Sequence, residues 1–339
     1  MNVVKGVRLK NFRCHGEFDL DCNRPTTLII GENGSGKTSV LEAIYLALRG
    51  KSFKGVDKEI LKRDEGFYRA EVELEDAQKI IIRFDGNKKE FEIDSKKSAR
   101  LPKKNRYPVV LFEPDDIYLV SSSPSRRRDY FDELFKQIND NYGLVLGKYN
   151  KALRQRNDLL KREIVGKDDL FSWNIMCANY GAELIKWRVR NLDKINEKMT
   201  AVYRDIANNQ DNCRIEYLGE VVSESEYLQK LEANFERDRI LGHTSFGVHR
   251  DDYEFIFNDK KADGSASRGE NRSMILSLKF IEAQILEKEV GKKPVVLLDD
   301  IFSELDEMRQ KHLVNNFKNY QMIITSTTVP SEMRVDKEL

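Results

Sequence analysis

The segment GENGSGKT at residues 31–38 constrains this chain more than any other feature. It follows the apolar run TTLII and fits the pattern G-x-x-x-x-G-K-[ST], with Gly31, Gly36, Lys37 and Thr38 at the fixed positions. A strand that leads through a glycine-rich loop into a helix points backbone N–H groups and a helix N-terminus at one spot, which suits a polyphosphate. An ordinary glycine-rich turn is disfavoured by the strand before the segment and the uninterrupted helix after it. The segment therefore predicts an α/β fold with a nucleotide site.

We expect this loop to bind ATP together with Mg²⁺. Lys37 is expected to reach the β- and γ-phosphates and to assist catalysis, and the Thr38 hydroxyl is expected to ligate the Mg²⁺ that bridges them. The predicted nucleotide-binding residues of this segment are Gly31, Glu32, Asn33, Gly34, Ser35, Gly36, Lys37, Thr38 and Ser39.

The composition restricts the class of protein further. A chain of 339 residues is long enough for one large domain with an insertion, or for two domains. The net charge is +1 with 34% charged residues, so any nucleic-acid surface has to be a local basic face. The four cysteines and four histidines form no disulfide or zinc pattern. Because there is no signal peptide and no apolar stretch of about 20 residues, we expect a cytoplasmic protein without membrane contact.

The order of the sequence patterns predicts a helical arm inserted into the nucleotide-binding head. Short alternating runs before residue 122 predict strands, including a half-exposed antiparallel sheet. Apolar residues at helical spacing then predict one helix up to Leu160 and a second through Trp173 to Met199, each about 30 to 35 residues long. Strand patterns resume after the arm. We therefore predict a head in two parts, 1–122 and 243–339, and an arm at 123–242.

A second half of the active site is predicted at VVLLDD, residues 295–300. Four apolar residues followed by two acids are typical of a buried parallel strand whose end delivers Asp299 to the metal. Asp300 is then placed to polarise the water that attacks the γ-phosphate. The alternative is a strand that simply ends in a polar turn.

The segment SRGEN, Ser267 to Asn271, predicts a second phosphate-binding helix start. It lies between the glycine-rich loop and the acidic strand. Two such helix ends in one chain suggest that Ser267 and Gly269 bind the nucleotide of another subunit, as in ABC-type ATPases, whose subunits enclose two ATP molecules head to tail. We therefore expect a homodimer.

Other nucleotide-binding classes fit less well. A GTPase would need an N-K-x-D motif, and NKKE at residues 87–90 lies in a charged hairpin. A transporter ATPase would bind a membrane partner and would lack the paired-helix arm.

The motifs together resemble the RecF family, which is related to the SMC and Rad50 ATPases. The resemblance covers nearly the whole chain. It is carried by LKNFR at 9–13, the glycine-rich loop, VVLFEPDD at 109–116, SSPSRRRDYFD at 122–132, GVHRDD at 247–252 and LLDDIFSELD at the end of the acidic strand. The insertion of about 120 residues is similar in length to that of RecF proteins and far shorter than the coiled coils of SMC proteins.

This resemblance implies an ABC-type ATPase head and a slow, ATP-driven switch. It implies a protein of DNA replication and recombinational repair that dimerises on ATP and recognises gapped duplexes or junctions of single- and double-stranded DNA. The family works with RecR and RecO to load RecA and takes part in the SOS response. The resemblance also assigns Arg13 of LKNFR to the nucleotide site.

The chain departs from the family pattern at the signature. Arg268, Glu270 and Asn271 stand where the family has glutamines, although SMC relatives also carry the glutamate. Asp300 stands where most ABC ATPases have glutamate, as in RecF proteins. Its side chain is one methylene shorter, which places the water at a poorer distance and fits slow hydrolysis.

Candidate DNA contacts are basic clusters, although such clusters are usually solvated faces. They are Arg126, Arg127 and Arg128, the loop 96–106, and Arg154, Arg156, Lys161 and Arg162 of the arm. The arginine triplet has a competing role as a partner of the acids in FEPDD. The run His249 to Asp252 is more typical of a buried ion-pair network than of catalysis.

Two other functions stay open at this point. One is a scaffold in which the nucleotide is a structural ligand. The other is an ATPase clamp that acts on a protein complex rather than on DNA.

Overall fold

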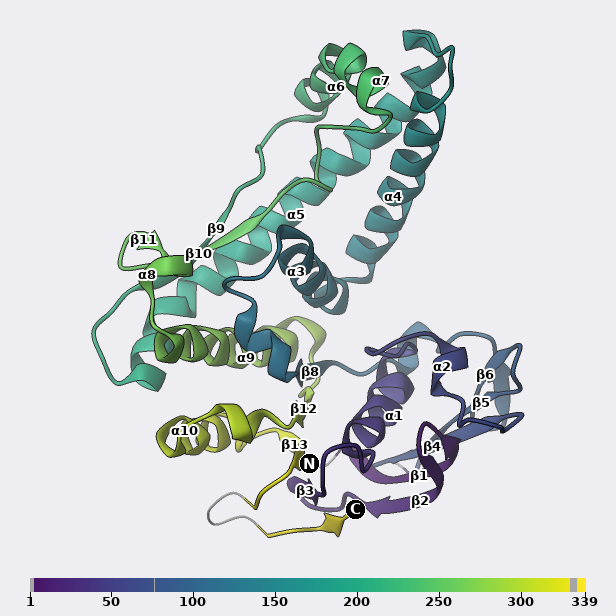
Figure 1. The fold of residues 1–339 in the computed structure, drawn as a ribbon, viewed down its shortest axis with the longest axis vertical. Helices are drawn as coiled ribbons and strands as arrows, with labels where there is room; N and C mark the ends of the chain where they lie inside the picture. Colours follow the sequence, from purple (N-terminus) through teal and green to yellow (C-terminus); the bar gives the residue numbers. More distant parts are fainter. Residues whose placement is uncertain (1–2, 76, 330–333) are drawn as a thin grey trace. The chain divides into compact units, whose positions relative to one another are not determined.

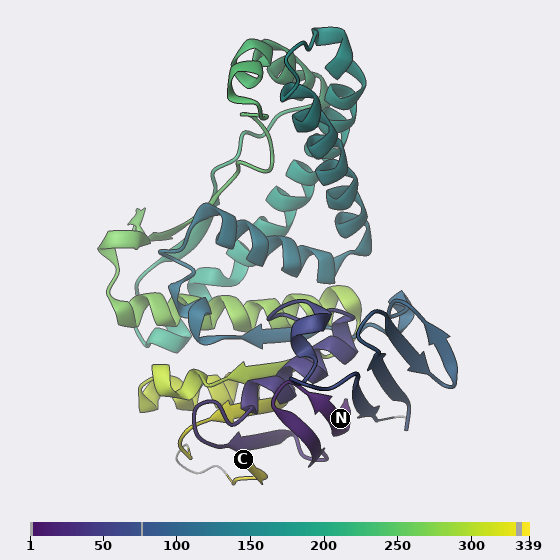
Figure 2. The same ribbon diagram turned by 45° about the vertical axis from the view of Figure 1, so that its right-hand side comes forward.

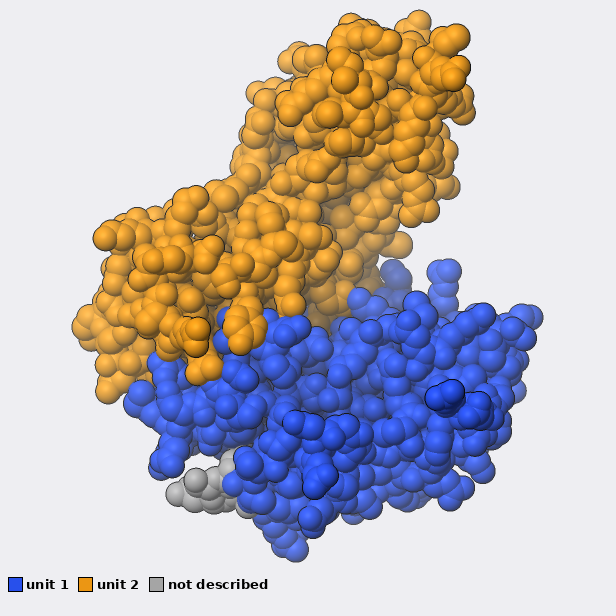
Figure 3. Space-filling view, viewed as in Figure 1, with its two compact units in different colours: residues 1–117, 282–339 blue, residues 118–281 orange. Residues whose placement is uncertain are grey.

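The computed structural model of the protein describes residues 3–75, 77–329 and 334–339. The chain divides into two compact units, which are residues 1–117 with 282–339 and residues 118–281 (Figure 3). We call the first the head unit and the second the arm unit. The arm unit is thus inserted between the two parts of the head unit.

The first layer of the head unit is a five-stranded sheet in which every neighbouring pair is parallel. Its strands, in spatial order, are β14 (Lys337–Glu338), β3 (Thr26–Ile30), β13 (Gln321–Ser326), β12 (Val295–Asp299) and β8 (Val109–Phe112). All residues of β12 and β13 are buried, which explains the continuous apolar run that precedes Asp299 in β12. The prediction of a buried parallel strand that ends at the acidic pair is therefore confirmed.

The second layer of the head unit is a six-stranded antiparallel sheet. Its strands, in spatial order, are β2 (His15–Asp21), β1 (Val4–Phe12), β4 (Tyr68–Leu74), β5 (Lys79–Phe84), β6 (Lys89–Ile93) and β7 (Lys96–Ser98). Buried and partly exposed residues alternate along β5, as the sequence pattern predicts for a half-exposed strand.

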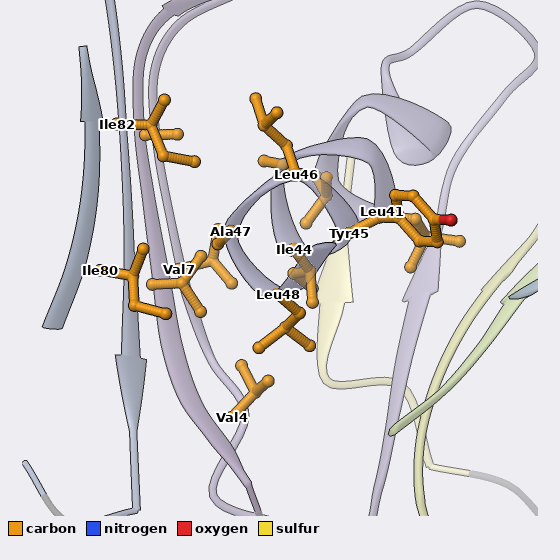
Figure 4. Close-up of a cluster of buried hydrophobic side chains, with 14 of the residues drawn as sticks. Val4, Val7, Leu41, Ile44, Tyr45, Leu46, Ala47, Leu48, Ile80 and Ile82 are labelled. Carbon is orange, nitrogen blue, oxygen red and sulfur yellow. The ribbon is translucent and has the colours of Figure 1, made fainter. Parts of the chain in front are cut away.

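Helix α1 (Lys37–Arg49) lies in the core between these layers (Figures 1 and 4). Leu41, Ile44 and Leu48 of this helix are fully buried, and the same core cluster contains Val7 of β1 and Ile82 of β5. Because α1 is apolar on nearly all sides, it packs against both sheets and holds the glycine-rich loop at its N-terminus in a fixed place.

Short helices complete the head unit. They are α2 (Asp57–Ile60), α10 (Glu307–Phe317) and the 3₁₀ turns η1 (Lys103–Asn105), η2 (Pro114–Tyr118) and η3 (Ile301–Glu304). Helix α9 (Arg268–Val290) begins in the arm unit and ends in the head unit.

The arm unit is mainly helical. Its helices are α3 (Pro124–Ile138), α4 (Asp140–Leu160), α5 (Lys167–Ala207), α6 (Glu224–Ala233), α7 (Phe235–Leu241) and the short α8 (Ala262–Ser265). Helices α4 and α5 run antiparallel, side by side (Figure 2). A small antiparallel sheet is formed by β9 (Cys213–Tyr217), β10 (Tyr253–Phe257) and β11 (Lys260–Lys261).

The prediction of one continuous first arm helix is wrong, because the structure has two helices there, α3 and α4. The helix is broken at Asn139, whose backbone is extended (φ −148°) and whose side chain accepts a hydrogen bond from the N–H of Asn141. Asparagine is a favoured helix-starting residue, and here it starts α4 immediately after α3 ends. The second arm helix is longer than predicted, at 41 residues. It ends at Ala207 and is followed by Asn208, which adopts the left-handed conformation (φ 51°).

The unit boundaries also differ in place from the sequence-based division. Residues 243–281 belong to the arm unit here, and β10 pairs with β9 of the arm. The division into 1–122, 123–242 and 243–339 stays a prediction about domains. None of the described helices combines the length and the apolar character that crossing a membrane requires.

Candidate nucleotide-binding site

The glycine-rich loop connects the end of β3 to the start of α1 and depends on glycine at two positions with positive φ. Gly34 has φ 85° and Gly36 has φ 100°, a region that other residues resist. A Cβ atom at Gly36 would lie 2.3 Å from Cys14 Sγ and 2.5 Å from His15 Nε2. The positive φ of Gly36 and its close contact with the side chains of Cys14 and His15 therefore favour glycine at this position.

The loop folds around the ammonium group of Lys37. Lys37 Nζ donates hydrogen bonds to the carbonyl oxygens of Gly31 and Glu32, both at 2.8 Å, and the residue is only 6% exposed. The buried hydroxyl of Ser35 finds no hydrogen-bond partner within the described part of the chain. A buried cation that is hydrogen-bonded to carbonyl oxygens, next to a hydroxyl with no partner among the described residues, suits a polyphosphate, so the loop fits the predicted ligand.

The two predicted metal ligands meet at the edge of the parallel sheet, although they are far apart in sequence. Thr38 Oγ1 donates to Asp299 Oδ1 at 2.8 Å, and Asp299 is 5% exposed. A hydroxyl beside a carboxylate is the protein part of a site for Mg²⁺, which keeps its other positions for water and phosphate oxygens. These residues therefore fit the metal that the motif implies.

Asp300 follows Asp299 in a left-handed conformation, with φ 48°. Its N–H donates to the carbonyl of Thr325 at 3.0 Å, and its Oδ1 accepts from the N–H of Thr327 at 3.2 Å. Burial raises the pKa of this carboxyl, although Lys37 opposes the shift, and Asp299 and Glu304 add to it. The turn thus aims a second, separately held carboxylate at the loop.

Arg13 reaches the same place from the turn between β1 and β2. Its Nε and NH2 donate to the two carboxylate oxygens of Glu42, at 2.8 and 2.7 Å, and NH1 donates to the carbonyl of Glu59 at 2.7 Å. Glu42 lies in α1 and is fully buried. The hydrogen bond to Glu42 raises the pKa of Arg13. The guanidinium is therefore fixed in orientation.

These groups surround a cavity of about 470 Å³. The residues predicted from the sequence that line this cavity are Arg13, Asn33, Gly34, Gly36, Lys37, Thr38, Ser39 and Asp300. Among the other predicted residues, Gly31, Glu32 and Ser35 form the loop behind it, and Asp299 pairs with Thr38. The structure thus brings together the loop, the acidic pair and Arg13.

Four further residues line the cavity and were not predicted from the sequence. They are Cys14, Lys54, Glu59 and Leu61. Lys54 is the most notable, because its Nζ lies 3.9 Å from Asp299 Oδ2. It belongs to the short segment after α1. No spacing rule shows that this segment returns to the acidic strand, so the sequence offered no signal for it.

Ser267 and Gly269 stand at the start of α9, in the arm unit. The N–H of Ser267 donates to Glu270 Oε2 at 2.6 Å, and the N–H of Glu270 donates to Ser267 Oγ at 3.3 Å. This reciprocal pair is a capping box, so a helix starts where the sequence predicts one. Neither residue lines the cavity of the head unit as the described residues define it. Their role toward a nucleotide stays a prediction.

Two arginines of the triplet have intramolecular partners within the arm unit, and the proposed pairing of the triplet with the acids of FEPDD stays a prediction. Arg127 pairs with Asp252 through two hydrogen bonds of 2.8 and 2.7 Å, and Arg128 NH1 donates to the carbonyl of Asp251 at 2.7 Å. Arg127 therefore pairs with the carboxylate of Asp252, and Arg128 is bound by the backbone of the neighbouring Asp251.

The prediction that Arg156 contacts DNA is wrong, because this residue is fully buried. It donates to Asn174 Oδ1 at 2.7 Å, to Asp238 Oδ2 at 2.8 Å and to Thr244 Oγ1 at 2.7 Å. Arg154, Lys161 and Arg162 are exposed, as are Lys96, Lys97, Arg100, Lys103 and Lys104 of the basic loop.

A second buried arginine, Arg188, confirms the ion-pair network that the run His249 to Asp252 suggests. It donates to Asp132 Oδ1 at 3.0 Å and to Asp251 Oδ2 at 2.8 Å, and it is 1% exposed. We call the five residues Asp132, Arg156, Arg188, Asp238 and Asp251 the arm ion-pair core.

The fold and the site together define an ABC-type P-loop ATPase. A family model described as "AAA domain" matches residues 7–322. The chain is 33% identical over 337 residues to the DNA replication and repair protein RecF of Clostridium acetobutylicum, covering 96% of this chain and 93% of that protein. It is 35% identical over 348 residues to RecF of Natranaerobius thermophilus, covering 95% and 90%. The chain belongs to the RecF family of DNA replication and repair proteins.

Solved structures agree with this assignment. The fold superposes with a TM-score of 0.88 on a structure described as the recombination mediator protein RecF-ATPrS in the RecFOR pathway, at 32% identity and with 99% of this chain and 95% of that chain covered. An Smc head bound to the C-terminal winged-helix domain of ScpA gives a TM-score of 0.54 at 15% identity, covering 96% of this chain and 90% of that chain. This second likeness shows the fold alone. The predicted fold class, an ABC-type ATPase head with an inserted helical arm, is confirmed.

Proposed function

We propose that this protein is an ATP-dependent DNA-binding protein of replication and recombinational repair, and that it uses ATP as a switch. The observation that carries the proposal is that Lys37, Thr38 and Asp300 line one cavity at the end of the parallel strands, where Thr38 is hydrogen-bonded to Asp299. The family supports the biological role.

Within this site the residues have separate tasks. Residues Gly31 to Ser39 and Arg13 bind the phosphates, and the Lys37 ammonium neutralises their charge. Thr38 and Asp299 would hold Mg²⁺, which when bound would supply positive charge to offset that of the phosphates. Asp300, whose carboxylate is held by the N–H of Thr327, accepts a hydrogen bond from the attacking water.

We further propose that ATP drives head-to-tail dimerisation. Ser267 and Gly269 at the start of α9 would face the nucleotide of the partner subunit, since a helix N-terminus favours an anion. Dimer closure would clamp duplex DNA, and hydrolysis would release it.

The DNA partner in this proposal is a gapped duplex or a junction of single- and double-stranded DNA. The exposed cations Arg154, Lys161 and Arg162, with those of the loop 96–106, supply phosphate contacts. By family, the further partners are RecR and RecO, and indirectly RecA, with a role in the SOS response and a cytoplasmic location.

Equilibrium binding of a fluorescent gapped duplex, followed by anisotropy, tests the proposal. With ATPγS and Mg²⁺ the affinity should exceed that of the nucleotide-free protein by about tenfold, a usual size for such coupling. Lys37→Arg should lose most of this gain, because a planar guanidinium does not fit a site built around an ammonium group. Lys51→Arg, at an exposed position just after α1, is the matched control. Equal affinity with and without nucleotide would refute the switch.

Measurements of ATP turnover and of dimerisation, made beside this binding experiment, separate the two rival functions. A nucleotide-binding scaffold would bind ATPγS without any change in DNA affinity and would show no turnover. A clamp that acts on a protein complex would hydrolyse ATP and dimerise, but its ATPase rate and dimerisation would not respond to DNA.

A further inference from the structure

Thr325 belongs to none of the motifs that identify the site, yet it contacts both Asp299 and Asp300. It is the penultimate residue of β13, and its side chain is fully buried. Strand β13 lies between β3, which leads into the glycine-rich loop, and β12, which ends at Asp299. In the sheet register Thr325 pairs with Asp299 on one side and with Ile29 on the other.

The hydroxyl of Thr325 contacts both members of the acidic pair. Oγ1 lies 2.9 Å from Asp299 Oδ1 and accepts a hydrogen bond from the N–H of Asp300 at 3.0 Å. A second acceptor, the carbonyl of Leu298, is farther away at 3.4 Å. A hydroxyl has one proton to donate, so the shorter and charged contact with Asp299 takes it.

The first contact orients the predicted metal ligand. Asp299 Oδ1 accepts from two hydroxyls, Thr38 Oγ1 at 2.8 Å and Thr325 Oγ1 at 2.9 Å. Thr38 is itself a predicted ligand, so its hydroxyl has to serve the metal. Thr325 is enclosed in the sheet. Its hydroxyl keeps the plane of the Asp299 carboxylate fixed while the Thr38 hydroxyl serves the metal. Outer groups of this kind orient metal-binding carboxylates in general.

The second contact orients the water-polarising carboxylate. Asp300 has φ 48°, and its N–H is shared between the carbonyl and the hydroxyl of Thr325, both at 3.0 Å. The N–H of Thr327 then holds Asp300 Oδ1 at 3.2 Å. The end of β13 therefore determines the direction in which the Asp300 side chain leaves the turn.

We propose that Thr325 is a positioning residue that orients Asp299 and Asp300 together through its single hydroxyl. The inference rests on the proposed function for the roles of the two carboxylates. It adds that metal binding and turnover depend on one buried hydroxyl in a strand that carries no recognised motif.

The test compares variants that keep either the hydroxyl or the shape of Thr325. Thr325→Val keeps the branched shape and removes the hydroxyl, whereas Thr325→Ser keeps the hydroxyl and removes the methyl group. The first readout is the Mg²⁺ concentration that gives half-maximal binding of a fluorescent ATP analogue. The second is the steady-state rate of ATP hydrolysis at saturating Mg²⁺.

We expect Thr325→Val to need about tenfold more Mg²⁺ and to turn over about tenfold to a hundredfold more slowly, the usual range for loss of an outer-shell partner. Thr325→Ser should stay within about threefold of the natural protein in both readouts. Thr27→Val is the matched control, since Thr27 is a buried threonine of β3 that pairs with Ile323, two residues before Thr325. It should change neither readout.

Two results would overturn the inference. In one, Thr325→Val matches the natural protein in Mg²⁺ requirement and rate. In the other, Val and Ser variants lose both properties equally, which would assign the effect to packing. Should the Val variant fail to fold, Thr325→Ala replaces it, and the comparison of Ala with Ser decides in the same way. Absence of Mg²⁺-dependent nucleotide binding in the natural protein would instead refute the proposed function itself.

Discussion

The nucleotide loop of the head unit and the ion-pair core of the arm unit both gather charged residues, but they satisfy these charges differently. In the head unit, Lys37 donates hydrogen bonds to two carbonyl oxygens of the loop, and Asp300 lines an open cavity. In the arm unit, Arg156 and Arg188 are enclosed and each is paired with buried carboxylates. Charges that are left open to a cavity are available to a ligand, whereas charges that are satisfied inside the fold hold the structure together.

The largest expected effect is on the stability of the arm unit. Arg156→Met removes the guanidinium and leaves the carboxylate of Asp238 buried without its cation, so unfolding should become easier by about 3–5 kcal/mol. Chemical denaturation followed by circular dichroism measures this. Arg154→Met, two residues earlier and exposed, is the matched control and should change stability by less than about 0.5 kcal/mol. Equal stability of the two variants would contradict the structural role of the core.

A substitution at the nucleotide site of the head unit should instead lower activity and leave stability unchanged. Asp300→Asn keeps the size of the side chain and removes the charge that polarises the water. ATP hydrolysis should fall by about 10² to 10⁴, while ATP binding measured by calorimetry is retained. A normal hydrolysis rate would remove Asp300 from the catalytic role. Glu304→Gln, in the 3₁₀ turn that follows, is a control for a nearby charge.

A smaller effect is expected from the pH dependence of arm stability. His249 Nε2 lies 3.0 Å from the carbonyl of Thr244 and Nδ1 lies 2.8 Å from the Tyr149 hydroxyl, which suits a neutral ring that donates from Nε2. Burial lowers the pKa of His249 to about 4. The Thr244 carbonyl and Asp238 oppose this shift, and Arg250 and Arg128 reinforce it.

Because the pKa is lower in the folded state, the unfolded chain binds the extra proton first as the pH falls. The stabilising effect of the neutral ring is therefore complete above pH 6.5 and is lost as the pH falls toward about 4, by at most about 3 kcal/mol. Thermal unfolding at several pH values, compared with His249→Gln, isolates this contribution. Parallel pH curves for the two proteins would show that His249 does not cause the loss.

The smallest effect is expected from single exposed cations of the arm. Replacing Arg162 by glutamine should weaken DNA binding uniformly across sequences and reduce the slope of log affinity against log salt by about 1. Replacing the exposed acid beside it, Glu163→Gln, is the matched control. An unchanged salt slope in the Arg162 variant would remove this residue from the DNA-binding surface.

The nucleotide site was largely predictable because its chemistry is encoded in short contiguous segments. The glycine-rich loop needs glycine and lysine at fixed spacing, and a strand buried on both faces needs an unbroken apolar run before Asp299. The pairing of Arg13 with Glu42 and the contacts of Thr325 were not predictable. They join residues from different strands and helices, and no local pattern marks them.

The arm was predicted less accurately, for two physical reasons. The apolar spacing continues across Asn139, so the helix break was missed although asparagine is a common helix start. Arg156 was interpreted as a surface cation because it is charged. It lies seven residues after Tyr149 and four before Leu160, on the apolar face of α4, and this position was the available signal of burial.

The central claim, an ATP-driven dimer that binds DNA, is tested most directly by light scattering of the protein with and without ATP and Mg²⁺, each with and without a gapped duplex. We expect a monomer without nucleotide, a dimer with ATP and a further shift toward the dimer with DNA, because linkage requires that DNA favours whichever state binds it more tightly. A protein that stays monomeric under all four conditions would contradict the account and would leave Ser267 and Gly269 without a partner's nucleotide to bind.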